Sequence, residues 1–254
     1  ANHAKNVGKN VLQIFFEDNP KVIQRKHLTC WMEGDVTLNE LNENFDEVLR
    51  VAQIKESQPG KIKLKKFPSD GTTIPHIKQY IKKQISLGFR PDIVLLDYID
   101  CVQPTKSFKD EWSGEGNVMR QFETLLSELD IAGWTAVQGN RSSINAETVD
   151  STMIGGSIKK GQIGHFILSI AKSLEQKENG RANMAILKSR FGKDGITFDD
   201  ILFNNGTIQI DMSTDDSRGK TFLESTEIKK VREQTIVNEA LDGLNNLSKL
   251  NNNN

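Results

Sequence analysis

The sequence lacks several features that would assign it to a common class of protein. It contains only two cysteines, Cys30 and Cys101, far apart and without metal-ligand spacing. This argues against a disulfide framework or a zinc site and favours a reducing cytosol. No run of about eighteen apolar residues occurs, so we expect no membrane-spanning helix. The net charge of −1 argues against a surface that is basic throughout, although it allows a few basic loops.

Two further absences concern the amino end and the nucleotide motifs. Residues 1–5 contain no initiating methionine and no apolar stretch like that of a secretory signal, so we expect that the first residue is not a natural start. The sequence also lacks G-x-x-x-x-G-K-[ST], the glycine-rich loop that cradles nucleotide phosphates. Gly8-Lys9 is followed by Asn10 and a strand pattern, which is typical of a turn instead.

Short apolar runs bounded by charged or turn residues indicate strands that are buried on both faces. The clearest is 91–98, in which four consecutive aliphatic residues lie between two acids. Similar runs predict strands at 10–16, 134–137, 165–170, 182–187 and 196–203. We expect Trp134, in the third of these runs, to lie in the core.

Helical patterns occupy the gaps between the early strands. Residues 20–33 follow a cap at Asp18 or Asn19, with Pro20 suited to the first turn. Residues 74–87 and 118–131 also have helical periodicity. A fourth helix is predicted over 38–54, with one apolar face formed by Leu38, Leu41, Phe45, Val48, Leu49 and Ala52. This alternation of strands and helices predicts a doubly wound, mostly parallel α/β sheet.

The carboxyl-terminal part of the sequence has a different character. Connections become short after residue 165, and Asn205-Gly206 between apolar runs is a strong hairpin signal, so we expect an antiparallel extension of the sheet. We therefore predict a main domain over 1–212 and a linker over 213–225. A helix over 226–250 and a disordered tail over 251–254 complete the prediction.

Two carboxylates follow predicted strands at the edge where α/β sheets bind ligands. Asp97 ends the strand at 91–98, where an acid can hold a magnesium ion through water, or simply cap the next turn. Glu17 follows the strand at 10–16, where it can act as a general base, or as an acid favoured by the following helix dipole. If the two strands are neighbours, both carboxylates lie at one crevice.

Three other polar residues end predicted strands. Gln138 can sense a phosphate by hydrogen bonding, or satisfy local backbone groups. Lys188 and Arg190, one residue apart, can reach a nucleotide held by a neighbouring subunit, or form a solvated basic edge of a hairpin.

These residues, taken in order, resemble a known family. The chain is similar to the RecA-like motor domain of DnaB-type hexameric replicative helicases, and most similar to the replicative helicase of T-even-like bacteriophages. The resemblance covers roughly residues 1–212. The stretches that carry it are 8–17 (GKNVLQIFFE), 92–98 (DIVLLDY), 134–142 (WTAVQGNRS), 155–160 (GGSIKK) and 187–192 (LKSRFG).

The resemblance implies roles in the use of ATP and Mg²⁺. Glu17 matches the glutamate that polarises the attacking water, and Asp97 matches the magnesium-linked aspartate. Gln138 matches the γ-phosphate sensor. Lys188 and Arg190 match the basic pair that one subunit donates to the next in a homohexamer, with Arg190 as the arginine finger.

The resemblance also implies that the chain binds single-stranded DNA in a central channel. The matching loop contains Gly155, Gly156 and Ser157, followed by Lys159 and Lys160, and glycines there allow close backbone approach to phosphates. Lys106 and Lys109, in a polar loop that faces the channel in the family, are further predicted DNA contacts. A flexible turn with solvated lysines is the alternative interpretation. A primase and a helicase loader are the implied protein partners, and no membrane is involved.

The absent phosphate cradle is the main departure from the family. It implies that the chain begins inside the helix that follows the cradle, so we expect little or no ATP hydrolysis by this polypeptide alone. Two alternatives stay open. One is a RecA-like recombinase or clock-type hexameric ATPase. The other is a non-catalytic assembly or loading partner on the same scaffold.

Overall fold

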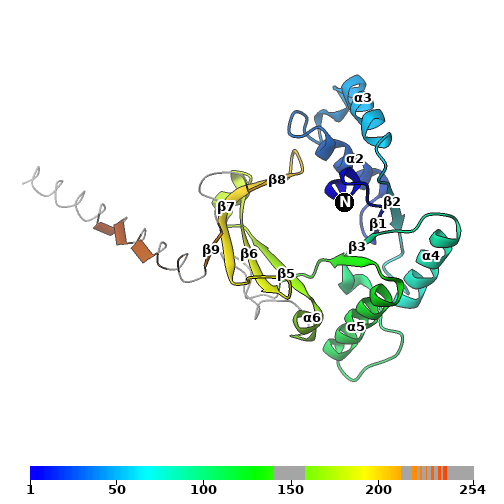
Figure 1. Cartoon of the computed structure of the whole chain (residues 1–254). Coiled ribbons are helices and arrows are strands. Elements are labelled where there is room, and N and C mark those ends of the chain that lie inside the picture. Colours follow the sequence, from blue (N-terminus) through cyan, green and yellow to red (C-terminus); the bar gives the residue numbers. More distant parts are fainter. Residues whose placement is uncertain are drawn as a thin grey trace, which may run out of the picture.

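The fold is described from a computed structural model that covers residues 1–139, 158–212 and 219–221, and single residues between 224 and 238. Within these ranges the strands form two sheets, one parallel and one antiparallel, with helices packed mainly around the first. Figure 1 shows the antiparallel sheet standing beside the part of the molecule that contains β1 to β4.

The first sheet has four parallel strands in the order β2-β1-β3-β4. Their bounds are β1 (Val11–Phe15), β2 (Ile62–Lys66), β3 (Ile93–Asp97) and β4 (Ala132–Thr135). β1 lies between β2 and β3, so its apolar residues are covered on both faces, and four of its five residues are buried. The predictions for β1 and β3 are confirmed, whereas β2 was missed and β4 begins two residues earlier than expected.

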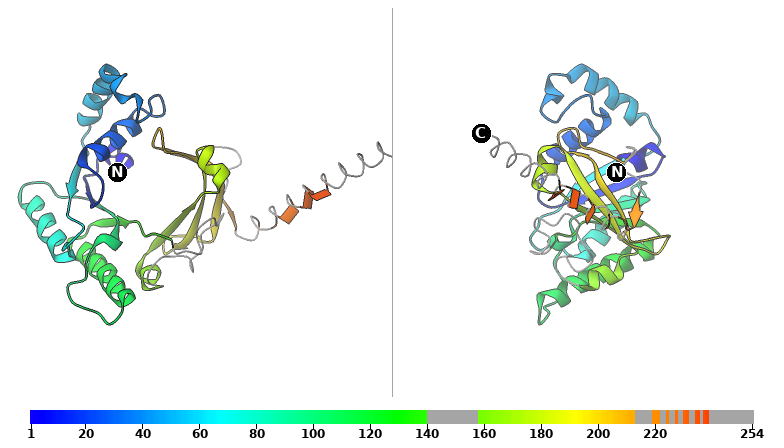
Figure 2. Two further views of the ribbon diagram at one scale, coloured as in Figure 1. Left: turned by 180° about the vertical axis from the view of Figure 1, so that it is seen from behind. Right: turned by 90° about the vertical axis from the view of Figure 1, so that its left-hand side faces the viewer.

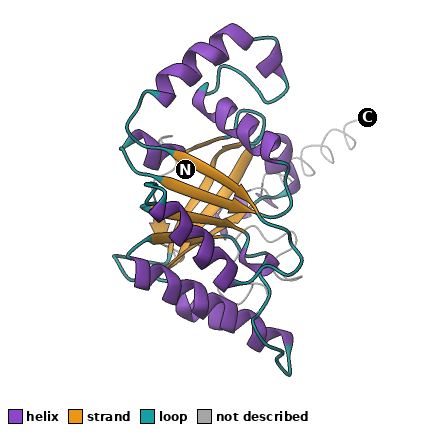
Figure 3. Cartoon of the chain, turned by 90° about the vertical axis from the view of Figure 1, so that its right-hand side faces the viewer, coloured by secondary structure: helices purple, strands orange, loops and turns teal. Residues whose placement is uncertain are grey.

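Helices cover both faces of this sheet, as Figure 3 shows. On one face are α1 (Asn2–Asn6), α2 (Pro20–Trp31), the short 3-10 helix η1 (Glu40–Asn42) and α3 (Phe45–Glu56). On the other face lie α4 (Ile74–Ser86) and α5 (Glu111–Leu129), with the 3-10 helix η2 (Ile99–Cys101) directly after β3.

The main core lies between the sheet and α4 and α5. Alternate residues of β1, Leu12 and Ile14, point toward these helices and meet Ile77 and Ile81 of α4 and Phe122 of α5. All five are at most 2% exposed. Since alternate side chains of a strand face opposite sides, the intervening residue Gln13 points toward α2.

The helix predicted over 38–54 is interrupted. Leu41 belongs to η1 and Val48 to α3, and both are buried in a small cluster with Met32. Phe45 and Leu49, which were expected on the same buried face, are 62% and 45% exposed. The prediction of one continuous helix was wrong, because the break after Asn42 rotates the start of α3 away from the earlier apolar positions.

The second sheet contains the antiparallel strands β5 (Phe166–Ala171), β6 (Arg181–Ser189), β7 (Ile196–Asn204), β8 (Gln209–Asp211) and β9 (Lys220–Thr221). The order is β5-β6-β7-β8, and β9 pairs with the other end of β7. The predicted hairpin is present: Asn204 turns the chain by accepting hydrogen bonds from the Gly206 and Thr207 amides. The antiparallel strands therefore form a sheet of their own.

Two short helices belong to this second part, α6 (Ile158–Ile163) before β5 and α7 (Leu174–Glu178) between β5 and β6. Figure 2 shows α6 on the side of the antiparallel sheet that faces α5. Among the described residues, no helix has the length and apolar character needed to cross a membrane. The single residues described between 224 and 238 are helical. The domain boundaries after 212 stay predictions.

Candidate functional site

The parallel sheet brings Glu17, Asp97 and Gln138 to one edge. β1 and β3 pair in register, with Phe15 opposite Asp97, so Glu17 emerges two residues beyond that pair. β4 pairs with β3 through Leu96 and Thr135, and Gln138 follows three residues later. Because all three strands run in the same direction, their carboxyl ends meet. The geometric expectation for these three side chains is met, while their catalytic roles stay predictions.

Tyr98 links the two outer members of this group. Its hydroxyl donates to Glu17 Oε1 over 3.3 Å and accepts from Gln138 Nε2 over 3.3 Å. A hydrogen bond with Cys101 is the largest of the causes that raise the pKa of Tyr98 to about 12, and burial and the nearby Glu17 charge add to it. The phenol therefore stays protonated and can bridge a carboxylate and an amide. Sequence reasoning missed this residue, although it directly follows Asp97.

The edge of the sheet beside Asp97 is acidic. Partial burial is the largest cause that raises the pKa of Asp97, and the charges of Asp18 and Glu17 raise it further. Lys26 opposes this rise, and its ammonium also lies 2.7 Å from the Asp18 carboxylate. Such grouped carboxylates repel one another, and a cation bound among them would relieve that repulsion.

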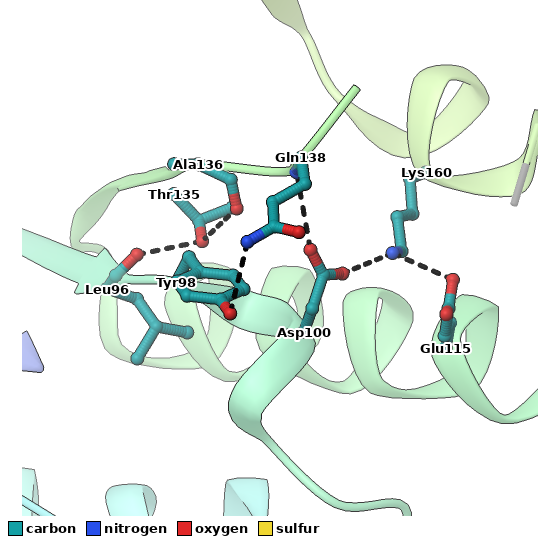
Figure 4. Close-up of polar contacts among 8 residues, drawn as sticks. All are labelled: Leu96, Tyr98, Asp100, Glu115, Thr135, Ala136, Gln138 and Lys160. Carbon is teal, nitrogen blue, oxygen red and sulfur yellow. Dashed lines mark hydrogen bonds and ion pairs between the residues drawn. The ribbon is translucent and has the colours of Figure 1, made fainter. Parts of the chain in front are cut away.

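A second polar group lies beside Gln138, as Figure 4 shows. The Gln138 amide nitrogen lies 3.5 Å from Asp100 Oδ2, and Asp100 Oδ1 accepts from the Lys160 ammonium. Lys160 also lies 2.8 Å from Glu115 Oε2 on α5. Neither Asp100 nor Glu115 was singled out from the sequence, because the contact depends on how α5 and α6 pack.

The two residues of the predicted basic pair differ in their surroundings. Lys188, in β6, donates to the carbonyl oxygens of Gly161 at 2.9 Å and Gln162 at 2.8 Å. Burial lowers the pKa of Lys188, and the nearby charge of Arg190 adds to this. Arg190 lies just beyond β6 with an exposed side chain. Both lie on the antiparallel sheet, away from the edge that carries Glu17.

The predicted DNA contacts have different outcomes. Gly155, Gly156 and Ser157 lie outside the described residues, as does the side chain of Lys159. Lys106 and Lys109 are exposed in the loop before α5, and Lys106 lies over the Phe108 ring at 5.4 Å. Lys160 was expected to face DNA. Its side chain is instead only 4% exposed, because it is enclosed between two carboxylates.

A cavity of about 320 Å³ adjoins this buried lysine. Asp100, Lys109, Glu115 and Lys160 are among the residues that line it. Among the described residues, no group of three or more histidine, cysteine, aspartate or glutamate side chains is arranged to hold a metal ion. Trp134, expected in the core, is 51% exposed at the outer edge of β4, where its ring lies 5.7 Å from that of Phe166.

Comparison with solved structures identifies the fold. No protein-family model and no curated protein matches the sequence. A DnaB-like replicative helicase, solved in work on its interactions with primase, matches with a TM-score of 0.69 and 14% sequence identity. That match covers 83% of this chain and 52% of the helicase, so the chain spans about half its length. A second solved structure, an isolated helicase ATPase domain, matches with a TM-score of 0.68 and 15% identity, over 83% of this chain and 76% of that domain. The chain therefore has the RecA-like α/β fold seen in the ATPase domains of DnaB-like replicative helicases.

Proposed function

We propose that this chain is the motor part of a ring-forming replicative DNA helicase that uses ATP hydrolysis to move along single-stranded DNA. The observation that supports this most directly is the convergence of Glu17, Asp97 and Gln138 at the carboxyl edge of adjacent parallel strands. The fold shared with helicase ATPase domains supports the same class of function.

In this proposal Glu17 is the general base that accepts a proton from the attacking water. Its carboxylate is exposed at the sheet edge and is oriented by the Tyr98 hydroxyl. Gln138 senses the γ-phosphate through its side-chain amide, which contacts Tyr98 from the other side.

Asp97 would hold Mg²⁺ through a water molecule. The grouped carboxylates beside it, which raise its pKa, fit the approach of a divalent cation. Bound with ATP, the ion would neutralise charge that develops on the phosphates. The phosphates themselves need a cradle, and the G-x-x-x-x-G-K-[ST] motif is absent from this sequence. This polypeptide alone is therefore proposed to hydrolyse ATP very slowly or not at all.

Arg190 is the residue proposed to reach a nucleotide on the neighbouring subunit of a hexamer. Its exposed position after β6 leaves the guanidinium accessible. Lys188 fits this role less well, because its ammonium is bonded to two carbonyl oxygens of α6. Single-stranded DNA is proposed to bind at 155–159 and at Lys106 and Lys109, and a primase and a loader are the proposed partners.

A second candidate is a non-catalytic assembly or loading partner built on the same scaffold. The absence of the cradle motif is the observation that favours it. The retained group of Glu17, Asp97 and Gln138 argues against it, because a binding scaffold has no need of a converging set of catalytic side chains.

The test supplies the missing cradle. The chain is extended at its amino end with the cradle segment of a DnaB-like ATPase domain, and hydrolysis of ATP is measured with and without single-stranded DNA. We expect DNA-stimulated hydrolysis that Glu17→Gln reduces by a factor of about 10² or more, since a general base contributes about that much. Glu43→Gln, which changes an exposed acid outside the site, is the matched control. Equal rates in the two variants would remove Glu17 from the mechanism.

Two further assays separate the candidates. A helicase unwinds a forked DNA substrate, whereas a recombinase exchanges strands between homologous duplexes. An assembly partner does neither, and it binds other replication proteins without hydrolysis. The unextended chain is measured in parallel, and rapid ATP turnover by it that Glu17→Gln abolishes would contradict the proposed need for a separate cradle.

A further inference from the structure

Lys160 is a buried cation enclosed by two carboxylates from different elements. It lies in α6, whereas Asp100 belongs to η2 and Glu115 to α5. Only 4% of the Lys160 side chain is exposed, against 24% for Asp100 and 23% for Glu115. A charge removed from water is tolerated only when paired. The ammonium therefore fastens α6 to two parts of the parallel-sheet half of the molecule.

Asp100 serves two partners at once. Its Oδ1 accepts from Lys160, and its Oδ2 lies 3.5 Å from the amide nitrogen of Gln138. The side chain of Gln138 contacts the Tyr98 hydroxyl, which in turn contacts Glu17. Figure 4 shows Tyr98, Gln138, Asp100, Lys160 and Glu115 as one continuous polar series. A displacement of Gln138 thus changes the surroundings of a carboxylate that holds α6.

We propose that Lys160 is a positioning residue, which through Asp100 couples the end of β4 at Gln138 to helix α6, and that it does not itself contact DNA phosphates. This inference rests on the proposed function for the meaning of the coupling, because Gln138 is the proposed phosphate sensor. The coupling itself is a property of the described residues and is testable without nucleotide or DNA.

The charges of the group predict how each substitution acts. Lys160→Met leaves two carboxylates facing each other, which is the strongest perturbation. Asp100→Asn keeps the shape of the side chain but weakens both of its contacts. Glu115→Gln weakens the attachment to α5 and leaves the contact between Asp100 and Gln138 in place. The cavity of about 320 Å³ beside the group gives a guanidinium room, so Lys160→Arg is the conservative rescue.

The first experiment measures amide hydrogen exchange of the full chain by mass spectrometry, without ligands. Lys160→Met and Asp100→Asn are expected to accelerate exchange several-fold both in 158–164 and in 134–139. Glu115→Gln is expected to accelerate 158–164 alone, and Lys160→Arg is expected to restore both. Lys177→Met, at an exposed lysine of α7, is the matched control. If Lys160→Met affects only 158–164, the coupling is absent and the proposal is overturned.

The second experiment separates positioning from direct DNA contact. Binding of the chain to a fluorescent single-stranded oligonucleotide is measured over a range of salt concentrations. Loss of one phosphate-contacting lysine lowers the slope of log K against log salt by about 0.7. Lys160→Met is expected to weaken binding and leave the slope unchanged, whereas Lys159→Met is expected to lower it. A slope lowered by Lys160→Met would overturn the positioning role.

The two experiments keep the inference separate from the proposed function. If neither the wild-type chain nor any variant binds single-stranded DNA, the proposed helicase function fails. Hydrogen exchange then still decides whether Gln138 and α6 are coupled. Lys160→Met is the variant most at risk of misfolding. Asp100→Asn, which conserves shape, gives the same reading of the coupling if that variant does not fold.

Discussion

The parallel sheet and the antiparallel sheet differ in how deeply their side chains are buried. The cluster around β1, β3, α4 and α5 contains fifteen buried apolar residues, whereas the cluster on the antiparallel sheet contains three, Ala182, Met184 and Ile201. Large apolar side chains of the second part, such as Ile170, Phe191 and Ile210, are 43% to 79% exposed. Parallel strands covered by helices on both faces form a complete core, and an antiparallel sheet with one open face does not.

This difference places the polar chemistry on the rigid part of the molecule. Glu17, Asp97 and Gln138 follow the strands β1, β3 and β4 of the parallel sheet. Arg190 and Lys188 belong to the less buried sheet. A motor needs one part that holds catalytic groups in place and another that moves relative to a neighbour, and the two halves differ in that sense.

Truncation of one core isoleucine in each half tests the comparison most strongly. Ile77 and Ile201 are both 0% exposed, but Ile77 is surrounded by the larger cluster. We expect Ile77→Ala to lower the free energy of unfolding by about 4 kcal/mol and Ile201→Ala by about 2 kcal/mol, because a small cluster relaxes into the cavity more completely. Urea denaturation followed by circular dichroism measures both. Equal losses would show that the halves are equally well packed, and Ile210→Ala is an exposed control.

The pH dependence of stability is expected to arise in the parallel-sheet half, at His27. Its ring nitrogens lie 2.9 Å from Asn2 Oδ1 and 2.8 Å from Gln13 Oε1, between α1, α2 and β1. In the neutral ring one nitrogen donates and the other accepts, so one of the two amides turns its NH₂ group to the ring. Burial, with a smaller contribution from the charge of the terminal amino group, lowers the pKa of His27 to about 4.

The sign of the effect follows from this lowered pKa. Between pH 6.5 and about 4 the unfolded chain binds a proton that the folded chain does not, so stability falls as pH falls through that window. At pH 5 the loss relative to pH 7.5 is expected to be about 2 kcal/mol from this residue. Urea denaturation of the wild type and His27→Gln at both pH values measures it. The same pH dependence in the variant would assign the effect to other groups.

The sequence predicted the parallel strands and helices well where burial on both faces leaves a continuous apolar run, as in β1 and β3. It missed β2 because Lys63, Lys65 and Lys66 make this edge strand appear polar. Their apolar stems pack against the sheet while the ammonium groups of Lys63 and Lys65 lie over aromatic rings. An aliphatic run alone does not reveal such a strand.

For the candidate site, strand ends were predictable and packing was not. Glu17, Asp97 and Gln138 follow from the rule that parallel strands present their carboxyl ends at one edge. The placement of Lys160 was not predictable, because its two carboxylate partners come from distant segments whose approach depends on tertiary structure. Trp134 was misjudged for a related reason: β4 is the outer strand of its sheet, so its side chains are less covered than those of a central strand.

Helix capping provides a smaller test of the same contrast. Asp110 caps the long helix α5 by accepting from the Ser113 amide at 2.7 Å, and Ser173 caps the short helix α7 by accepting from the Gln176 amide at 3.1 Å. We expect Asp110→Ala to cost about 1 kcal/mol and Ser173→Ala about 0.5 kcal/mol, because α7 adds little to the core. Thermal denaturation measures both, and Asn at either position is expected to restore most of the loss. A larger effect at Ser173 would reverse the ranking of the two halves.

The smallest expected effect concerns a direct contact between the two sheets. The rings of Trp134 on β4 and Phe166 on β5 lie 5.7 Å apart at 66°, an edge-to-face arrangement. A double-mutant cycle with Trp134→Leu and Phe166→Leu is expected to give a coupling energy of about 0.5–1 kcal/mol in urea denaturation. The cycle also reports on cooperativity, because a contact between parts that unfold together stabilises the whole transition. If the coupling is zero and circular dichroism and tryptophan fluorescence give separate transitions, the two halves unfold independently. The contact of Lys160 with Asp100 and Glu115 would then be too weak to join them in the absence of ligands.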